Sequence, residues 1–352
     1  MKTILVTGGA GFIGSNYIQH TLQTHADVHI INYDALTYAG NLENLKSVQN
    51  HPRYTFIHGD VCNAEDVQKL FAAYPIDYVV NFAAETHVDR SIYGPEAFVR
   101  ANVLGTMVLL GAAKQAWQIG DDVYKEGCKY LQVSTDEVYG SLGPTGLFSE
   151  TSPLDAHSPY SASKTSADLM VKAYHDTYRF PANITRCSNN YGPYQFPEKL
   201  IPLMIYNAIH GRPLPIYGDG LQIRDWLFVL DHCSAINAVL FGAQPGQVYN
   251  IGGNNECTNL AIVNAILTYC HEHVDAQIGP QLITHVTDRK GHDRRYAIDA
   301  TKIKTDLGWT PQYTFDKALP QTIDWYLQNQ DWLNNVTSGE YKNYYSFMYD
   351  KR

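Results

Sequence analysis

The sequence predicts an α/β protein built on a doubly wound parallel sheet of the Rossmann type, with a smaller, loop-rich α/β lobe. Three observations lead to this prediction. Up to about residue 140, short β-branched apolar runs alternate with helical patterns, which is typical of βαβ units. A glycine-rich stretch follows the first of these runs. After Asn189, glycine, proline and aromatic residues become frequent, which indicates a second, irregular lobe.

The elements of the predicted sheet follow in order along the chain. Its predicted strands are Thr3–Thr7, Val28–Tyr33, Tyr54–Gly59, Ile76–Ala83 and Tyr130–Ser134. The predicted helices are Phe12–Gln23, Ala64–Ala73, Phe98–Trp117 and Ser158–Tyr178. A helix at Asp231–Phe241 and a strand at Val248–Ile251 are expected to return to this region. Because parallel strands end at one edge of the sheet, the residues after each strand are expected to meet in a ligand crevice.

Composition excludes several classes of protein. The formal net charge of −9 argues against a nucleic-acid-binding protein, because such proteins present a basic face. The longest apolar runs are about seven residues, shorter than the ~20 that a membrane-spanning helix needs. The six cysteines are scattered without a C-x-x-C pair, which favours free thiols in a cytoplasmic protein. His271 and His273 do not share a helix face, so no metal site is predicted.

The glycine-rich stretch is a candidate phosphate loop. Gly8, Gly11 and Gly14 form G-x-x-G-x-x-G between the first predicted strand and the first helix. Glycine permits a tight turn there, and the helix N-terminus offers unpaired N–H groups to a pyrophosphate. Three glycines alone would also fit an ordinary turn. Asp34 adds context, because it ends the second predicted strand twenty residues after Gly14, where a carboxylate accepts hydrogen bonds from a ribose 2′-OH. The pattern therefore favours NAD over NADP.

A second pattern indicates proton-transfer chemistry. Tyr160 and Lys164 are four residues apart on a predicted helix, so they share one face. A lysine ammonium is expected to lower the phenol pKa from its usual ~10. The phenolate could then remove a hydroxyl proton as a hydride leaves the same carbon. The pattern alone is not specific, because Tyr313 and Lys317 have the same spacing without a matching upstream strand.

Thr135, Asp136 and Glu137 directly follow the predicted strand Tyr130–Ser134, so their side chains are expected at the crevice. Two adjacent carboxyl groups with opposite roles need environments that push their pKa values apart. A solvated acidic turn is the alternative. On these residues the chain resembles the extended short-chain dehydrogenase/reductase family. The Thr-Asp-Glu triplet narrows the resemblance to the nucleotide-sugar 4,6-dehydratases, since simple sugar epimerases lack the acid pair.

The resemblance extends over about residues 1–328. Further matching stretches are 85–91, 187–193, 196–202, 223–226 and 291–296. It implies an NAD-binding domain at 1–188 plus about 227–253, a nucleotide-sugar-binding lobe at 189–226 plus about 254–330, and a C-terminal tail at 331–352. It also implies a homodimer, in which the helices Phe98–Trp117 and Ser158–Tyr178 pair with their copies as a four-helix bundle.

The implied reaction converts dTDP-glucose to dTDP-4-keto-6-deoxyglucose and water, with tightly bound NAD regenerated in each turnover. Tyr160 would take the C4 hydroxyl proton while Thr135 binds that oxygen. Lys164 would hold the phenolate and the nicotinamide ribose. Glu137 would remove the C5 proton, and a protonated Asp136 would release the C6 hydroxyl as water. In bacteria this reaction supplies dTDP-rhamnose and other deoxysugars. Another nucleotide-sugar dehydratase or epimerase, or a catalytically silent NAD-binding module, remains an alternative.

The candidate ligand-binding residues form two sets. The cofactor set is Gly8, Gly11, Phe12, Ile13, Gly14, Asp34, Ala35, Leu36, Thr37, Asp60, Val61, Phe82, Ala83, Ala84, Thr86, Ala101, Tyr160, Lys164 and Asn190. The substrate set is Thr86, Thr135, Asn189, Lys199, Leu200, Pro215, Ile216, Tyr217, Arg224, Asn259, Arg289 and His292. In the second set, the two arginines suit bidentate phosphate contacts, and Tyr217 could stack on the base.

Overall fold

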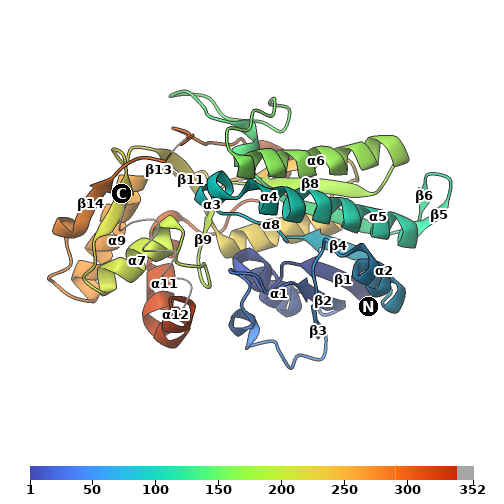
Figure 1. Cartoon of the computed structure of the whole chain (residues 1–352), viewed down its shortest axis with the longest axis horizontal. Helices are drawn as coiled ribbons and strands as arrows, with labels where there is room; N and C mark the ends of the chain where they lie inside the picture. The colour runs from blue at the N-terminus through green and yellow to red at the C-terminus, as the bar shows by residue number, and fades with distance from the viewer. Residues whose placement is uncertain (290, 339–352) are drawn as a thin grey trace.

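A seven-stranded sheet forms the centre of the computed structural model, which describes residues 1–289 and 291–338 (Figure 1). Its strand order is β12-β8-β7-β4-β1-β2-β3, and every pair is parallel. The strands are β1 (Lys2–Thr7), β2 (Val28–Asp34), β3 (Tyr54–His58), β4 (Tyr78–Asn81), β7 (Lys129–Thr135), β8 (Ala182–Cys187) and β12 (Val248–Ile251). The predicted doubly wound parallel sheet is confirmed. Strand order reverses between β1 and β4, which places the ligand crevice at their carboxyl ends.

Helices cover both faces of this sheet. One face carries α1 (Phe12–Thr24), α8 (Val229–Gly242) and α10 (Thr301–Leu307), and the other carries α2 (Ala64–Ala73), α5 (Gly105–Trp117) and α6 (Pro159–Tyr178). Successive side chains along β1 point to opposite faces of the sheet and pack into the cores on both sides. Ile4 and Val6 join the core beneath α1 and α8, whereas Leu5 joins the core beneath α2 and α5. A sheet buried on both faces explains why its strands are continuous apolar runs.

One predicted helix is longer and less regular than expected. It begins at Pro95 as α4 (Pro95–Phe98), passes through a π-helical turn, η2 (Val99–Leu104), and continues as α5. Pro95–Trp117 is long and apolar enough to cross a membrane by length and composition. Its Leu109, Leu110 and Trp117 are buried against the sheet, as in a core helix of a globular protein. The π turn brings Asn102 to the Glu85 backbone, whose N–H donates to Asn102 Oδ1 at 2.8 Å.

A smaller lobe has its own apolar core and two small sheets. The sheets pair β10 (Leu214–Tyr217) with β14 (Ile283–Val286), and β11 (Ile223–Phe228) with β13 (Glu256–Thr258) and β9 (Asn189–Tyr191). Around them pack α7 (Leu200–Ile209), α9 (Asn259–His273), α11 (Phe315–Gln328) and α12 (Gln330–Val336). The region from residue 331, which shows no helical period in the sequence, thus begins in α12, where Trp332 and Leu333 are buried. Its remainder, residues 339–352, lies outside the described residues.

The remaining short elements lie in connections. They are η1 (Leu42–Leu45), α3 (Val88–Tyr93), the hairpin strands β5 (Gln118–Gly120) and β6 (Val123–Tyr124), η3 (Asp136–Tyr139) and η4 (Pro280–Leu282). Two of them matter for function. Strand β7 runs directly into η3, and α3 follows the carboxyl end of β4. Both therefore start at the edge of the sheet where a ligand is expected.

Candidate active site

A cavity of about 480 Å³ lies at the carboxyl ends of β1, β2, β4 and β7. It brings together all five predicted catalytic residues, Thr135, Asp136, Glu137, Tyr160 and Lys164. Every predicted cofactor residue lines it except Leu36. Leu36 instead packs against the apolar core beneath α1, with a left-handed backbone (φ 51°), and its N–H donates to Asp34 Oδ1. The turn after β2 directs the Leu36 side chain inward, so only its main chain is available to a cofactor, and its role there stays a prediction.

The glycine loop has the geometry of an anion site. Gly8 has φ +69°, and a Cβ there would lie 2.6 Å from the Ala83 nitrogen. A Cβ on Gly14 would lie 2.4 Å from the Gly8 carbonyl oxygen, so both positions need glycine. Gly11 is the N-cap of α1, and neither a side chain at the cap nor an acidic residue in the first turn occupies its N–H groups. Because both glycines face the cavity beside this helix end, a diphosphate fits there.

Two alanine substitutions separate packing from ligand binding in this loop. Gly14→Ala is expected to lower the free energy of unfolding by about 1–3 kcal/mol, because its Cβ meets backbone atoms. Gly11→Ala is expected to leave stability within about 0.5 kcal/mol, because its Cβ would meet only the Gly8 oxygen at 3.3 Å. That methyl group would nevertheless weaken NAD binding. Denaturant unfolding and titration with NAD measure the two effects, and equal loss of stability in both variants would contradict this account.

Asp34 ends β2 and is held by the backbone on two sides. Its Oδ2 accepts the Ala10 N–H and its Oδ1 accepts the Leu36 N–H, both at 2.8 Å. Burial raises the pKa of Asp34, and these two hydrogen bonds oppose the rise. A carboxylate has about four lone-pair sites, so two remain for ribose hydroxyl groups. The fixed orientation of this acid follows from the close approach of the glycine loop.

The acid pair is positioned by the end of β7. Thr135 caps η3, because its Oγ1 accepts the Glu137 N–H at 3.2 Å and donates to Asp136 Oδ1 at 3.3 Å. Asp136 is buried at 2% exposure, whereas Glu137 is half-buried. Burial, with the charges of Glu137 and Asp225, raises the pKa of Asp136 well above its ordinary value. This shift favours the protonated form, in which Asp136 can donate a proton. This is no solvated acidic turn.

Tyr160 lies in the first turn of α6, and Lys164 follows one turn later. Ser158 and Ser161 form a capping box at the start of this helix, and Pro159 occupies its first position. Both functional side chains are buried and face the cavity. They come together on one helix face as the spacing predicted.

The pKa shift of Tyr160 has the opposite direction to the one predicted from its spacing to Lys164. Lys164 Nζ donates to the Val133 carbonyl oxygen at 2.8 Å, and burial lowers its pKa. The pKa of Tyr160 is raised well above its ordinary value, mainly by burial and next by Glu137, although a hydrogen bond with Thr135 opposes the rise. The expected lowering by Lys164 is thus wrong for the protein alone. Burial outweighs the ammonium, because the low-dielectric site penalises a phenolate.

The predicted substrate residues occupy two places. Thr86, Thr135, Asn189 and Lys199 line the cavity, whereas the other eight lie outside its lining in the smaller lobe. Those eight are Leu200 at the start of α7, Pro215, Ile216 and Tyr217 in β10, Arg224 in β11, Asn259 at the start of α9, and Arg289 and His292 after β14. The side chain of Ile216 is 1% exposed in the lobe core, so only its main chain is available to a ligand.

Arg224, Arg289 and His292 lie close enough together to affect one another's pKa. Arg224 is buried, stacks on the Tyr296 ring with its guanidinium carbon 4.3 Å from the centroid, and donates to the Asp293 carbonyl oxygen at 2.9 Å. Burial lowers its pKa, and the charge of Arg289 adds to the lowering. Burial, with Arg289 again contributing, lowers the pKa of His292 to about 4. A cluster in which cations disfavour one another suits an anionic ligand such as a diphosphate.

Several residues at the site were not predicted. Tyr38, Glu85 and Glu198 line the cavity, and Tyr296 lies close enough to Glu137 for that carboxylate to raise its pKa. Glu198 belongs to the 196–202 stretch, and Tyr38 follows Asp34 by four residues. Neither position carries a local pattern that would distinguish a cavity residue from a core residue. Among the described residues, no group of three or more His, Cys, Asp and Glu could hold a metal ion.

The parallel sheet, the glycine loop at its switch point and the Tyr160–Lys164 helix face define a dinucleotide-dependent short-chain dehydrogenase/reductase. The acid pair places it among the enzymes that remove water from nucleotide sugars. The chain belongs to the GDP-mannose 4,6 dehydratase family, which matches residues 5–322.

Its relatives narrow the comparison within that family. It is 51% identical to a dTDP-glucose 4,6-dehydratase of Xanthomonas campestris, over 97% of this chain and 98% of that protein. A Bacillus anthracis dTDP-glucose 4,6-dehydratase in complex with NAD is 49% identical, with a TM-score of 0.86 over 96% of this chain and 100% of that one. The Streptomyces venezuelae enzyme with NAD and TYD bound is 44% identical, with a TM-score of 0.87 over 95% and 99%.

Proposed function

We propose that the protein converts dTDP-glucose to dTDP-4-keto-6-deoxyglucose and water, as an NAD-dependent hydro-lyase. The main support for the proposal is that one cavity is lined by two adjacent carboxyl groups, Asp136 and Glu137, by Tyr160 and by the dinucleotide loop. An oxidoreductase needs only Tyr160 and its cofactor. An adjacent acid and base are what the loss of water from neighbouring carbons requires.

The cofactor is NAD. Gly8, Gly11 and Gly14 would hold its diphosphate, and Asp34 its adenosine ribose, where a negative carboxylate repels a 2′-phosphate. When bound, NAD accepts a hydride from C4 of the sugar and returns one to C6. Because the dinucleotide is regenerated within one turnover, it does not need to leave between turnovers.

Tyr160 removes the proton of the C4 hydroxyl group during oxidation. Its hydrogen bond with Thr135 aligns the phenol and offers a second contact to the C4 oxygen. Because burial raises the pKa of Tyr160, the phenolate needs stabilisation from neighbouring groups and bound ligands. Lys164 supplies a buried cation one helical turn away.

Glu137 removes the proton from C5, which the C4 ketone has made acidic, and C5 is protonated again when a hydride reaches C6. Asp136 donates its proton to the C6 hydroxyl group, so that the group leaves as water. The two carboxyl groups can hold opposite protonation states because only Asp136 is buried at 2% exposure and has Asp225 as a further negative neighbour.

The smaller lobe holds the nucleotide part of the substrate. Arg224, Arg289 and His292 would bind the diphosphate, and Lys199 lines the cavity that holds the acid pair. The nucleotide-sugar lobe comprises residues 189–226 and about 254–330, except for the segment around α10, which packs on the large sheet. The NAD-binding domain comprises residues 1–188 and about 227–253. The reaction takes place in the cytoplasm and supplies deoxysugar synthesis, of which dTDP-rhamnose is one product.

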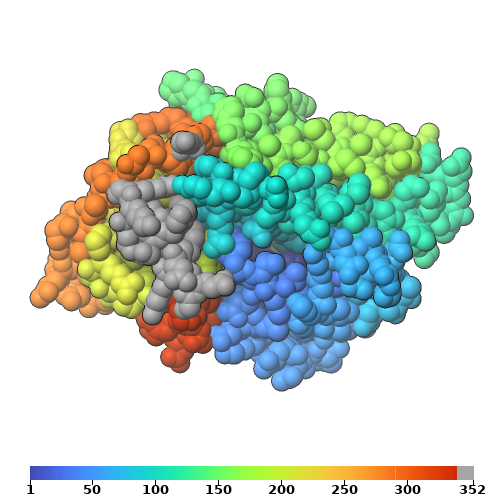
Figure 2. All heavy atoms as spheres, in the orientation of Figure 1, coloured from blue at the N-terminus to red at the C-terminus, as the bar shows by residue number. Residues whose placement is uncertain are grey.

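The protein acts as a homodimer through α5 and α6. Met107 on α5 is 41% exposed and Leu169 on α6 is 51% exposed, and the two helices pack against each other. In Figure 2 the teal residues of α5 and the green residues of α6 adjoin on one surface. Apolar side chains exposed along two neighbouring helices are what a four-helix bundle with a second copy would bury.

A turnover assay tests the proposed function. The purified protein is incubated with dTDP-glucose, UDP-glucose or GDP-mannose without added NAD, and mass spectrometry follows a product lighter by one water. Loss of water from dTDP-glucose alone is expected. Loss from another sugar would correct the substrate, and an isomer of unchanged mass would replace the reaction by epimerisation. If no sugar loses water even with NAD supplied, the roles of Asp136 and Glu137 are wrong.

A further inference from the structure

We propose that Tyr38, Glu198 and Arg90 form an interlobe clamp that holds the cofactor loop, residues 35–41 between β2 and η1, closed over the bound dinucleotide. The inference rests on the proposed function, because only an enzyme that regenerates its cofactor in place benefits from retaining it. The three residues touch no reacting atom. They are positioning residues for the loop.

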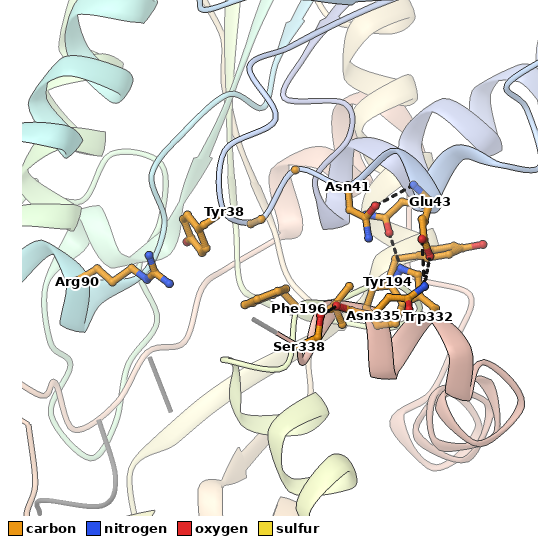
Figure 3. Close-up of a pocket in the computed structure, with 13 residues that line it drawn as sticks. Tyr38, Asn41, Glu43, Arg90, Tyr194, Phe196, Trp332, Asn335 and Ser338 are labelled. Carbon is orange, nitrogen blue, oxygen red and sulfur yellow. Dashed lines mark hydrogen bonds between the residues drawn. The ribbon is translucent and has the colours of Figure 1, made fainter. Parts of the chain in front are cut away.

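The clamp joins three segments that are distant in sequence. Tyr38 lies on the cofactor loop, and its hydroxyl group donates to Glu198 Oε1 at 3.1 Å. Arg90 of α3 places its guanidinium carbon 3.9 Å from the centroid of the Tyr38 ring. The Arg90 Nε lies 3.6 Å from Glu198 Oε2, so each of the three residues contacts the other two. Figure 3 shows the Arg90 side chain reaching toward the Tyr38 ring, with Phe196 on the opposite side of the loop.

Glu198 is the fixed point of the clamp. Its side chain is 2% exposed, and its N–H donates to the Phe196 carbonyl oxygen at 2.8 Å. The neighbouring Lys199 donates to the Thr86 carbonyl oxygen at 3.0 Å, which ties the same segment to the larger domain. A buried carboxylate is costly unless cations and donors surround it. Burial raises the pKa of Glu198, and Lys199, Arg90 and the Tyr38 hydroxyl group oppose that rise. An open loop would therefore leave Glu198 with fewer partners.

The clamp stands between two cavities. Tyr38, Ala39, Gly40 and Phe196 line both the 480 Å³ cofactor cavity and a second cavity of about 310 Å³. The two cavities therefore share the cofactor loop as a wall. Moving the loop outward would open the cofactor cavity into the second one, and the clamp opposes that movement.

The η1 end of the connection between β2 and η1 is held by contacts that do not involve Tyr38, Glu198 or Arg90. Trp332 Nε1 of α12 donates to Asn44 Oδ1 at 2.7 Å, and Asn335 donates to the Glu43 carboxylate. Figure 3 shows these contacts at the other end of the second cavity from Arg90. With η1 anchored, Leu36 packed against the core and the Asn41 N–H bonded to the Ala10 carbonyl oxygen, residues 37–40 are the part of the connection that can open. The Tyr38–Glu198 hydrogen bond ties them to the smaller lobe, together with the Tyr38–Phe196 ring contact, with centroids 6.1 Å apart.

The rate of NAD release tests the clamp without requiring catalysis. Each protein is purified with NAD bound and mixed with excess isotopically labelled NAD, and mass spectrometry follows the exchange of bound cofactor. Tyr38→Phe keeps the ring and removes the hydroxyl group, so release is expected to be about tenfold faster, as for the loss of one hydrogen bond to a charged group. Glu198→Gln keeps the shape of the side chain, removes its charge and is expected to accelerate release as well.

Tyr269→Phe is the matched control. It also removes a tyrosine hydroxyl group that donates to a carboxylate, Asp324 Oδ1 at 2.7 Å, but it lines neither cavity. Its release rate is expected to equal that of the wild type. The clamp variants are also expected to lose activity on dilution and to regain it with added NAD, which a general loss of folding would not produce.

The outcomes separate the two proposals. Release at the wild-type rate in both Tyr38→Phe and Glu198→Gln, in a protein that dehydrates dTDP-glucose, would overturn the clamp alone. Faster release in both variants of a protein that dehydrates no nucleotide sugar would overturn the proposed function and support the clamp. Equal acceleration in the Tyr269→Phe control would also overturn the clamp.

Discussion

Replacing Glu137 by glutamine is expected to lower kcat for water loss by about 10³-fold, the size of effect that removal of a general base produces. Glutamine has nearly the same shape, and the Glu137 N–H keeps its hydrogen bond to Thr135, so the turn after β7 should be retained. The variant loses only the group that removes the C5 proton. Mass spectrometry of the product gives kcat, and the NAD content of the purified variant should match that of the wild type.

The control for this variant is Glu85→Gln, which changes another carboxylate that lines the same cavity. Product formation within a few-fold of the wild type is expected for Glu85→Gln. Unchanged product formation in Glu137→Gln would contradict its assignment as the base. A large loss in Glu85→Gln instead would transfer the role to that residue.

Tyr160→Phe is expected to slow oxidation at C4 by about 10²- to 10⁴-fold, because no phenolate can form to accept the hydroxyl proton. The ring is retained, so its packing with Phe98, with centroids 6.3 Å apart, should persist. The measurement is the near-ultraviolet absorbance of reduced nicotinamide after the holoenzyme is mixed with dTDP-glucose. A variant that still reduces its bound NAD would remove Tyr160 from this role.

The two variants also check each other. With substrate, Glu137→Gln should accumulate reduced cofactor, because oxidation precedes removal of the C5 proton. Tyr160→Phe should not accumulate it, because the first step is blocked. If both variants accumulate reduced cofactor, or neither does, the order of the two residues in the reaction is wrong.

The sequence predicted features that are local. Strand β1, the glycine loop and α1 are consecutive, and the positive φ of Gly8 and the close approach of Gly14 follow from that short connection. The start of α6 is set by Ser158, Pro159 and Ser161, which are again neighbours in the chain. The acid pair follows β7 directly, so the end of one strand fixes its place at the crevice.

Other features depend on which distant segments meet. The direction of the Tyr160 pKa shift could not be derived from the spacing to Lys164, because it follows from burial and from Glu137, which reaches the phenol from another element. Leu36 could not be separated from its neighbours Ala35 and Thr37, since the turn decides which side chain points into the core. α12 was missed because its two large apolar residues, Trp332 and Leu333, are adjacent and show no helical period.

The sequence by itself determined the sheet class, the dinucleotide loop and the candidate catalytic residues, because turn chemistry and side-chain periodicity act over a few neighbouring residues. Only the tertiary structure decided how those residues are charged and what holds the cofactor loop in place. The pKa of Asp136 is raised because the residue is buried beside Glu137 and Asp225, and Tyr38 meets Glu198 across 160 positions of sequence. Burial and contacts of this kind depend on how the two lobes fold together, which no local pattern encodes.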